Sequence, residues 1–175
     1  MRTMLLLAVG TALAIPAELE GQDIGGLTLQ GGTTIPLDPD ESVRAGFSGS
    51  LTFVVGRFAL GPEVGWYFTA APEHSPSRRP ENVVTIGAVT RYDLTGGRWR
   101  PFLVGGVGVQ YWESTRQGYP TDNSWELSGG VGLRQALTGW PLALSGELRG
   151  HTSLQSSGLQ GRTFMTATIG LSWRW

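Results

Sequence analysis

From residue 24 onward, apolar side chains alternate with small or polar ones over runs of about ten residues. Successive side chains of a β-strand point to opposite sides, so this period of two predicts strands with one apolar and one polar face. The clearest run has Trp99, Leu103, Val107, Val109 and Tyr111 on its apolar face and Arg100, Gly106, Gly108 and Gln110 on its polar face.

The same pattern predicts eight strands. They cover residues 25–35, 44–55, 58–69, 82–94, 99–111, 124–137, a strand beginning at 142, and 165–175. Their connections alternate in length: residues 56–57, 95–97 and 138–140 are short, whereas 36–43, 70–81, 114–123 and 155–162 are longer. The sequence therefore predicts an all-β fold, an eight-stranded antiparallel up-and-down transmembrane β-barrel over residues 24–175, with four longer external loops and three short periplasmic turns. An even number of strands places both termini on the periplasmic side.

The alternation alone does not say which face points outward, since a soluble lipocalin-like barrel has its apolar face inside. Three features favour the transmembrane arrangement. Aromatic side chains stand near strand ends on the apolar face, as interfacial girdles require: Trp66, Phe68, Tyr92, Trp99, Tyr111, Trp125, Trp173 and Trp175. Opposite charges stand in mid-strand on the polar face, where a narrow lumen would hold them: Glu63, Arg91, Glu126, Arg134, Glu147 and Arg149. The sequence also stops on Trp175 itself.

Composition supports a lipid-facing wall. Only 15% of the 175 residues are charged, where roughly 25% is usual in soluble domains, and 27 are glycine. All 13 basic residues are arginine and 14 residues are acidic, so there is no basic field for nucleic acid. The absence of cysteine excludes disulfides and thiolate chemistry.

Residues 1–17 have the features of a secretory signal peptide. Arg2 precedes an apolar stretch that ends at Ala14, and small residues offer cleavage after Ala14 or Ala17. A transmembrane helix would need about 20 apolar residues, and Pro16 and Glu18 interrupt this stretch too early.

The last residues carry a family resemblance. Thr168, Gly170, Trp173 and Trp175 form a pattern that resembles the terminal signal of bacterial outer-membrane proteins, which in that family is read by the barrel-assembly machinery. With the signal peptide and the strands, the mature chain resembles the small outer-membrane β-barrel superfamily that includes the OmpA transmembrane domain and OmpX. The resemblance implies an integral, monomeric outer-membrane protein whose surroundings are membrane lipid and lipopolysaccharide. The peptidoglycan-binding domain of full-length OmpA is missing, so that function is not carried over.

The inward charges are the first candidate site. An unpaired ion in a narrow lumen is costly, so we expect Glu63 to pair with Arg91, and Glu147 to pair with Arg134 or Arg149. A structural polar plug is favoured over an ion path.

His151, Ser153 and Glu147 are a weak catalytic alternative. Histidine, serine and a carboxylate can form an acyl-transfer triad, and this segment resembles a motif of the lipid A deacylase PagL. That family has asparagine where Leu154 stands and a downstream glutamate that is missing here. The alternation also points His151 and Ser153 into the lumen, so we expect no enzyme activity.

Two of the longer loops carry charge. Asp38, Asp40 and Glu41 could bind calcium through their carboxylates, but their spacing is too short and incomplete for an EF-hand loop. Arg78-Arg79 beside His74 could bind lipopolysaccharide phosphates, and this signal is weak. No metal or cofactor is expected. The predicted function is a non-enzymatic outer-membrane barrel with a surface-interaction or envelope-integrity role; the alternatives are a narrow ion or small-solute channel and, less favoured, the lipid A deacylase.

Overall fold

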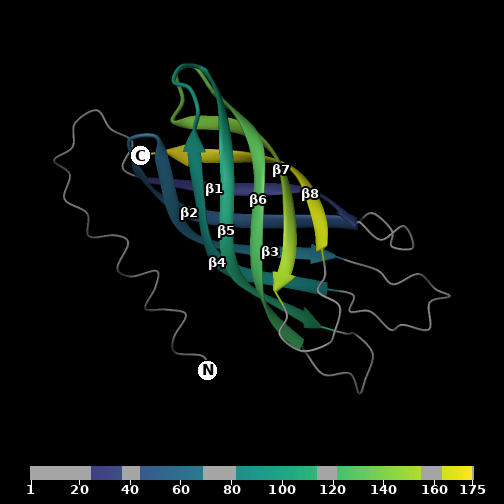
Figure 1. Ribbon diagram of the computed structural model, residues 1–175. Coiled ribbons are helices and arrows are strands. Elements are labelled where there is room, and N and C mark those ends of the chain that lie inside the picture. Colours follow the sequence, from purple (N-terminus) through teal and green to yellow (C-terminus); the bar gives the residue numbers. More distant parts are fainter. Residues whose placement is uncertain (1–24, 37–43, 69–81, 114–121, 155–162, 175) are drawn as a thin grey trace, which may run out of the picture.

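Eight antiparallel strands close into a single β-barrel in the computed structural model of the chain (Figure 1). The structure describes residues 25–36, 44–68, 82–113, 122–154 and 163–174. The strands are β1 (Gly25–Pro36), β2 (Arg44–Val55), β3 (Phe58–Phe68), β4 (Asn82–Asp93), β5 (Trp99–Glu113), β6 (Asp122–Ala136), β7 (Leu142–Leu154) and β8 (Thr163–Arg174). Each strand pairs with its neighbour in sequence, and β1 pairs with β8 to close the wall. The predicted eight-stranded antiparallel barrel is therefore confirmed.

The predicted strand boundaries agree with the observed ones or differ from them by at most two residues. The largest differences lie in the β5–β6 hairpin and at the start of β8, which begins at Thr163. The hairpin is longer than predicted because the ladder continues through the pairs Tyr111↔Asn123 and Trp112↔Asp122. The predicted signal peptide, the four longer loops, with Asp38, Asp40, Glu41, His74, Arg78 and Arg79, and the terminal Trp175 lie outside the described residues.

Three short turns join β2 to β3, β4 to β5 and β6 to β7 at one end of the barrel, called here the turn end. Each turn contains one glycine with a positive φ angle: Gly56 at 60°, Gly97 at 99° and Gly139 at 79°. Glycine reaches this region without the steric cost of a Cβ atom, so the tight hairpins predicted from the sequence can form. Among the described residues, no helix is long and apolar enough to cross a lipid bilayer.

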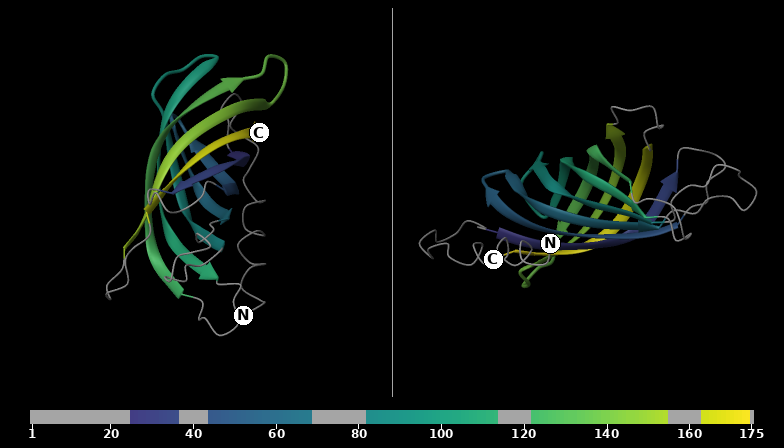
Figure 2. Two further views of the ribbon diagram at one scale, coloured as in Figure 1. Left: turned by 90° about the vertical axis from the view of Figure 1, so that its right-hand side faces the viewer. Right: turned by 90° about the horizontal axis from the view of Figure 1, so that it is seen from below.

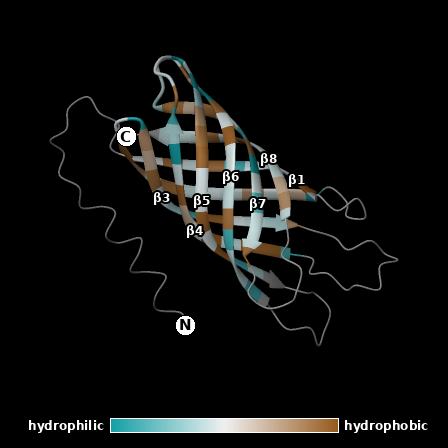
Figure 3. Ribbon diagram, in the orientation of Figure 1, coloured by the Kyte–Doolittle hydropathy of each residue, from teal (hydrophilic) through white to brown (hydrophobic). Residues whose placement is uncertain are grey.

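The outer face of the wall is apolar on every strand. Large apolar side chains point outward and are exposed, among them Leu29, Phe47, Val64, Ile86, Val107, Val131, Leu148 and Ile169. Figure 3 shows the resulting bands of hydrophobic and hydrophilic residues that alternate along the strands, and Figure 2 shows how the tilted strands curve into the wall. A soluble protein does not present so large a continuous apolar surface to water. The lipocalin-like alternative, with its apolar face inside, is therefore wrong for this chain.

The lumen also contains apolar side chains, although the alternation predicts a polar inner face. One cluster consists of Tyr67, Val83 and Phe164, and a second consists of Val89, Phe102 and Val104. They occur where consecutive residues are apolar, as in Phe102-Leu103-Val104, so that both faces of the strand are apolar there. The inner face thus carries apolar clusters among its buried polar side chains.

Candidate functional site: the charged lumen

Four charged side chains from three strands form an ion cluster in the middle of the lumen. Glu63 comes from β3, Arg91 from β4, and Glu147 and Arg149 from β7. Arg91 Nη2 lies 3.2 Å from Glu63 Oε2, and Arg91 Nε lies 3.2 Å from Glu147 Oε2. Arg149 Nη1 contacts Glu63 Oε1 and lies 3.7 Å from Glu147 Oε1. Each arginine therefore joins both carboxylates, and all four side chains are buried.

Neutral side chains satisfy further hydrogen-bonding groups of this cluster. Gln30 Nε2 donates to Glu147 Oε2 at 3.3 Å. Arg91 Nη1 donates to Ser50 Oγ at 3.1 Å, and Arg149 Nη2 donates to Ser128 Oγ at 2.6 Å. Buried ions of opposite charge are tolerated in a low-dielectric interior only with such additional partners.

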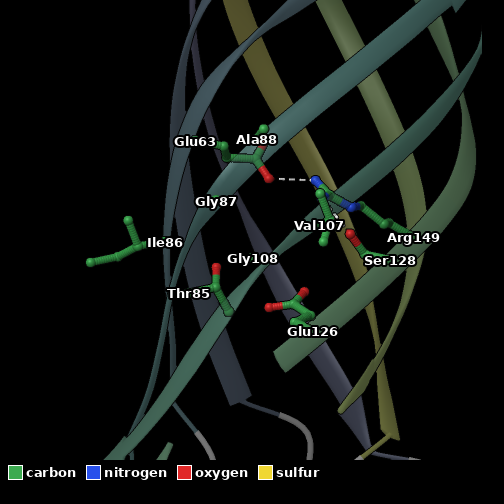
Figure 4. Close-up of a pocket in the computed structure, with 10 residues that line it drawn as sticks. All are labelled: Glu63, Thr85, Ile86, Gly87, Ala88, Val107, Gly108, Glu126, Ser128 and Arg149. Atoms are coloured by element: carbon green, nitrogen blue, oxygen red, sulfur yellow. Dashed lines mark hydrogen bonds and ion pairs between the residues drawn. The ribbon is translucent and has the colours of Figure 1, made fainter. Parts of the chain in front are cut away.

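The free space beside this cluster is very small. Figure 4 shows a cavity between strands with Glu63, Glu126, Ser128 and Arg149 around it. Its volume is about 10 Å³, which is room for about one water molecule. Gly106 contributes to the tight fit, because a Cβ atom there would lie 2.3 Å from Arg149 Nη2.

A second ion pair lies nearer the turn end. Arg134 Nη1 contacts the two carboxylate oxygens of Asp93 at 3.1 and 3.3 Å. Its guanidinium also lies over the ring of Phe102, 5.1 Å from the ring centroid. The expected pairing of Glu63 with Arg91 is present, and of the two partners expected for Glu147 the structure shows Arg149, together with Arg91, whereas Arg134 pairs with Asp93. The reason is register: Arg134 is opposite Ser145, closer to the turn end than Glu147.

Asp93 was missed as a lumen residue. The available signal was its spacing of two residues from Arg91, which places both side chains on the same face of β4.

A third polar group lies toward the opposite end of the barrel. His151 Nδ1 contacts Glu126 Oε1, and His151 Nε2 lies 3.2 Å from Thr166 Oγ1. The imidazole stacks on Phe164 with ring centroids 4.7 Å apart and an interplanar angle of 5°. Tyr67 packs against both rings with centroids 5.4 Å away. His151 is therefore part of a buried aromatic layer that fills this part of the lumen.

The weak catalytic alternative is not assembled as predicted. The carboxylate at His151 belongs to Glu126, whereas Glu147 binds the two arginines of the central cluster. Ser153 is buried and faces the lumen, as does His151.

The Glu126 carboxylate, the His151 imidazole and the Thr166 hydroxyl contact one another in the spatial order of an acyl-transfer triad. Thr166 Oγ1 lies 3.2 Å from His151 Nε2 and is also placed to donate a hydrogen bond to the Arg149 carbonyl oxygen at 3.4 Å. The cavity that Glu126 lines holds about one water, so no acyl substrate fits there. Glu126, His151 and Thr166 are all buried in the lumen.

The predicted girdle residues lie on the outer face in two bands. Trp66, Phe68, Tyr111 and Trp125 stand at the strand ends away from the turns. Tyr92, Trp99 and Trp173 stand at the turn end. Neighbouring rings are in contact distance, with centroids 6.2 Å apart for Trp66 and Phe68 and 4.6 Å apart for Phe58 and Tyr92. Trp175 is the one predicted girdle residue that lies outside the described part of the chain.

The residues of the terminal pattern alternate across the wall. Thr168 and Gly170 face the lumen and are buried, whereas Trp173 is exposed on the outer face. The described residues hold no group of three or more histidine, aspartate or glutamate side chains placed to bind a metal ion.

No protein-family model and no curated protein sequence matches this chain. The fold is similar to that in the crystal structure of Neisserial surface protein A (NspA), with a TM-score of 0.67 and 14% sequence identity over 86% of this chain and 97% of that chain. It is also similar to the N-terminal β-barrel domain of Pseudomonas aeruginosa OprF, with a TM-score of 0.57 and 16% identity over 88% of this chain and 100% of that chain. The chain therefore has the fold of the small eight-stranded outer-membrane β-barrels.

Proposed function

We propose that this chain is an integral protein of a bacterial outer membrane with a non-enzymatic surface-interaction or envelope-integrity role. The observation that carries the proposal is the contrast between the two faces of the wall: the outer face is apolar all around, and the inner face is closed by paired charges and packed rings. In a closed barrel, hydrogen bonds between neighbouring strands pair the backbone N–H and C=O groups, and no edge strand is left with unpaired groups in lipid. Such a wall is a rigid support, and function then belongs to the segments that join its strands.

The proposed orientation places the turn end and both termini in the periplasm. Short turns on the periplasmic side and longer segments outside are the usual arrangement of these barrels. We further propose lipid and lipopolysaccharide as the surroundings of the wall, a monomeric state, and the barrel-assembly machinery as a partner during biogenesis. Among the described residues, we propose that the barrel-assembly machinery recognises Thr168, Gly170 and Trp173.

The membrane location is tested by cell fractionation followed by electrophoresis of unboiled and boiled samples. We expect the protein in the outer-membrane fraction, with a mobility that changes on boiling because the closed hydrogen-bonded wall resists detergent until it is heated. The same sample unfolded in urea before loading is the control and should migrate as the boiled form. Recovery in the soluble periplasmic fraction without a mobility shift would refute the proposal.

A narrow channel is the alternative function, and the contents of the lumen argue against it. Three polar groups and two apolar clusters occupy it, and the cavity beside the central ion cluster has room for about one water. Moving an ion through would require at least one buried ion pair to separate in a low-dielectric interior, which is costly.

We therefore expect no stable single-channel conductance when the folded protein is inserted into a planar bilayer at neutral pH. The control is an Arg149→Ala, Glu63→Ala double variant, which removes two side chains of the central cluster and should admit water more readily. Regular conductance steps from the parent protein would overturn the closed-lumen interpretation.

A further inference from the structure

A cavity separate from the central cluster opens at the turn end of the lumen. Its volume is about 240 Å³, far more than the space beside Glu63. Arg100 and Arg134 line it, together with the small side chains of Ala136 and Ala143 and the larger ones of Trp140 and Leu142. Arg134 and Ala143 are buried, whereas Trp140 is exposed at the rim. The cavity is therefore large enough for the polar group of a small molecule.

Two of the residues that line this cavity are arginines from neighbouring strands. Arg100 on β5 is the direct register partner of Arg134 on β6, and both are on the inward face of their strands. Like charges directly opposite one another destabilise an antiparallel pair unless an anion compensates them. Arg134 has the carboxylate of Asp93 as its partner.

Arg100 has a different environment. Its Nε donates to the Gly97 carbonyl oxygen at 2.8 Å, and within the described residues no carboxylate forms an ion pair with it. That single bond orients the guanidinium and leaves its terminal nitrogens for another acceptor. A planar guanidinium held in this way matches a phosphate or carboxylate group by two parallel hydrogen bonds.

The rim of the cavity is apolar and reaches the outer face. Trp140 is 69% exposed, and Leu142 is the register partner of Trp173, which is exposed on the outside of β8. Tryptophan side chains at this level are typical of the membrane–water interface. The cavity therefore has a cationic part at the two arginines and an apolar part at its lipid-facing rim. An amphipathic anion has a charged group and an apolar group that would match these two parts.

We propose that this cavity binds the phosphate headgroup of an anionic membrane phospholipid, with the phosphate at Arg100 and Arg134 and the acyl chains over the rim at Trp140 and Leu142. The inference rests on the proposed membrane location. A phosphate placed there compensates the charge of Arg100 and shields the like-charged pair. Free phosphate shares the headgroup chemistry but would make no use of the apolar rim.

The test uses the full folded chain in maltoside micelles, with native mass spectrometry to count bound molecules of a short-chain phosphatidylglycerol. We expect one saturable site, with affinity about tenfold lower in Arg100→Gln, because a charge-assisted hydrogen bond of roughly 1.4 kcal/mol or more is lost. Arg98→Gln is the matched control: it removes the same charge from an exposed neighbour at the same end, and its affinity should equal that of the parent. Equal losses in both variants, or none in Arg100→Gln, would overturn the site.

A second variant separates the two sources of phosphate. Trp140→Ala changes only an exposed turn side chain and should weaken phosphatidylglycerol binding while leaving competition by inorganic phosphate unchanged. If inorganic phosphate binds as tightly as the lipid and depends equally on Arg100, the lipid assignment is wrong. A heat-modifiable barrel that binds no lipid would refute this inference alone, whereas loss of the mobility shift in the parent protein would refute the proposed membrane location.

Discussion

The Glu63→Gln variant is expected to unfold at a clearly lower urea concentration than the parent barrel, with a free energy of unfolding lower by about 3–5 kcal/mol. Glu63 accepts from both Arg91 and Arg149. Glutamine keeps the size of the side chain and removes the charge, so two buried arginines would share the single carboxylate of Glu147. Urea titration of the protein in lipid vesicles, followed by tryptophan fluorescence and electrophoretic mobility, measures the difference.

Two further variants show whether charge is the cause. Ser128→Ala removes one neutral acceptor from Arg149 and should cost only about 1 kcal/mol. The double variant Glu63→Gln, Arg149→Gln removes a cation together with its anion, and it should lose less stability than the sum of the single variants. An unfolding midpoint of Glu63→Gln equal to that of the parent would show that the ion cluster is not stabilising.

Gly130→Ala should prevent most of the protein from reaching the folded, heat-modifiable form, although it adds a single methyl group. A Cβ atom at Gly130 would lie 2.1 Å from the Leu148 carbonyl oxygen and 2.7 Å from the Arg149 Cα atom. Both atoms belong to the backbone of β7, so relief requires the β6–β7 ladder to separate locally. Overpacking of this kind costs about 1–3 kcal/mol or more.

The neighbouring glycine provides a matched control. A Cβ atom at Gly129 would have its nearest neighbour, the Val104 carbonyl oxygen, at 3.9 Å, an ordinary contact. Gly129→Ala should therefore fold to the same extent as the parent. The folded fraction is measured in unboiled samples as the share of protein in the band whose mobility changes on boiling. Equal folding of the two alanine variants would mean that the strands do not need this close approach.

The same geometry explains the high glycine content of the inner face. Gly87 and Gly108 are direct register partners on β4 and β5, and a Cβ atom on either would lie within 2.6 Å of a backbone oxygen of the other strand. At Gly106, the Arg149 guanidinium occupies the space that a side chain would fill. A narrow barrel filled by charged side chains thus depends on glycine at neighbouring inner positions.

The strands, their two faces and the short turns could be predicted from the sequence because each depends on local rules. Alternation over residues 99–111 identified β5 and its outward face, and a glycine in each short turn marked the hairpins. The boundaries of the β5–β6 hairpin were less certain, since they depend on how far two strands continue to pair. Both faces of Phe102-Leu103-Val104 are apolar, so alternation alone did not show that Phe102 fills the lumen.

The sequence by itself determined which charged residues face inward, and only the tertiary structure decided their partners. Glu63 and Arg149 are separated by 86 positions and meet across the lumen, and His151 contacts Glu126 from 25 positions away. Such contacts depend on strand tilt and stagger, which the closure of the whole barrel fixes. Local alternation specifies the side of the wall to which each side chain points. Closure of the barrel specifies the position of that side chain along the barrel axis and the residue that it meets across the lumen. For that reason Arg134 pairs with Asp93, and the cavity beside Arg100 appears only when all eight strands are in place.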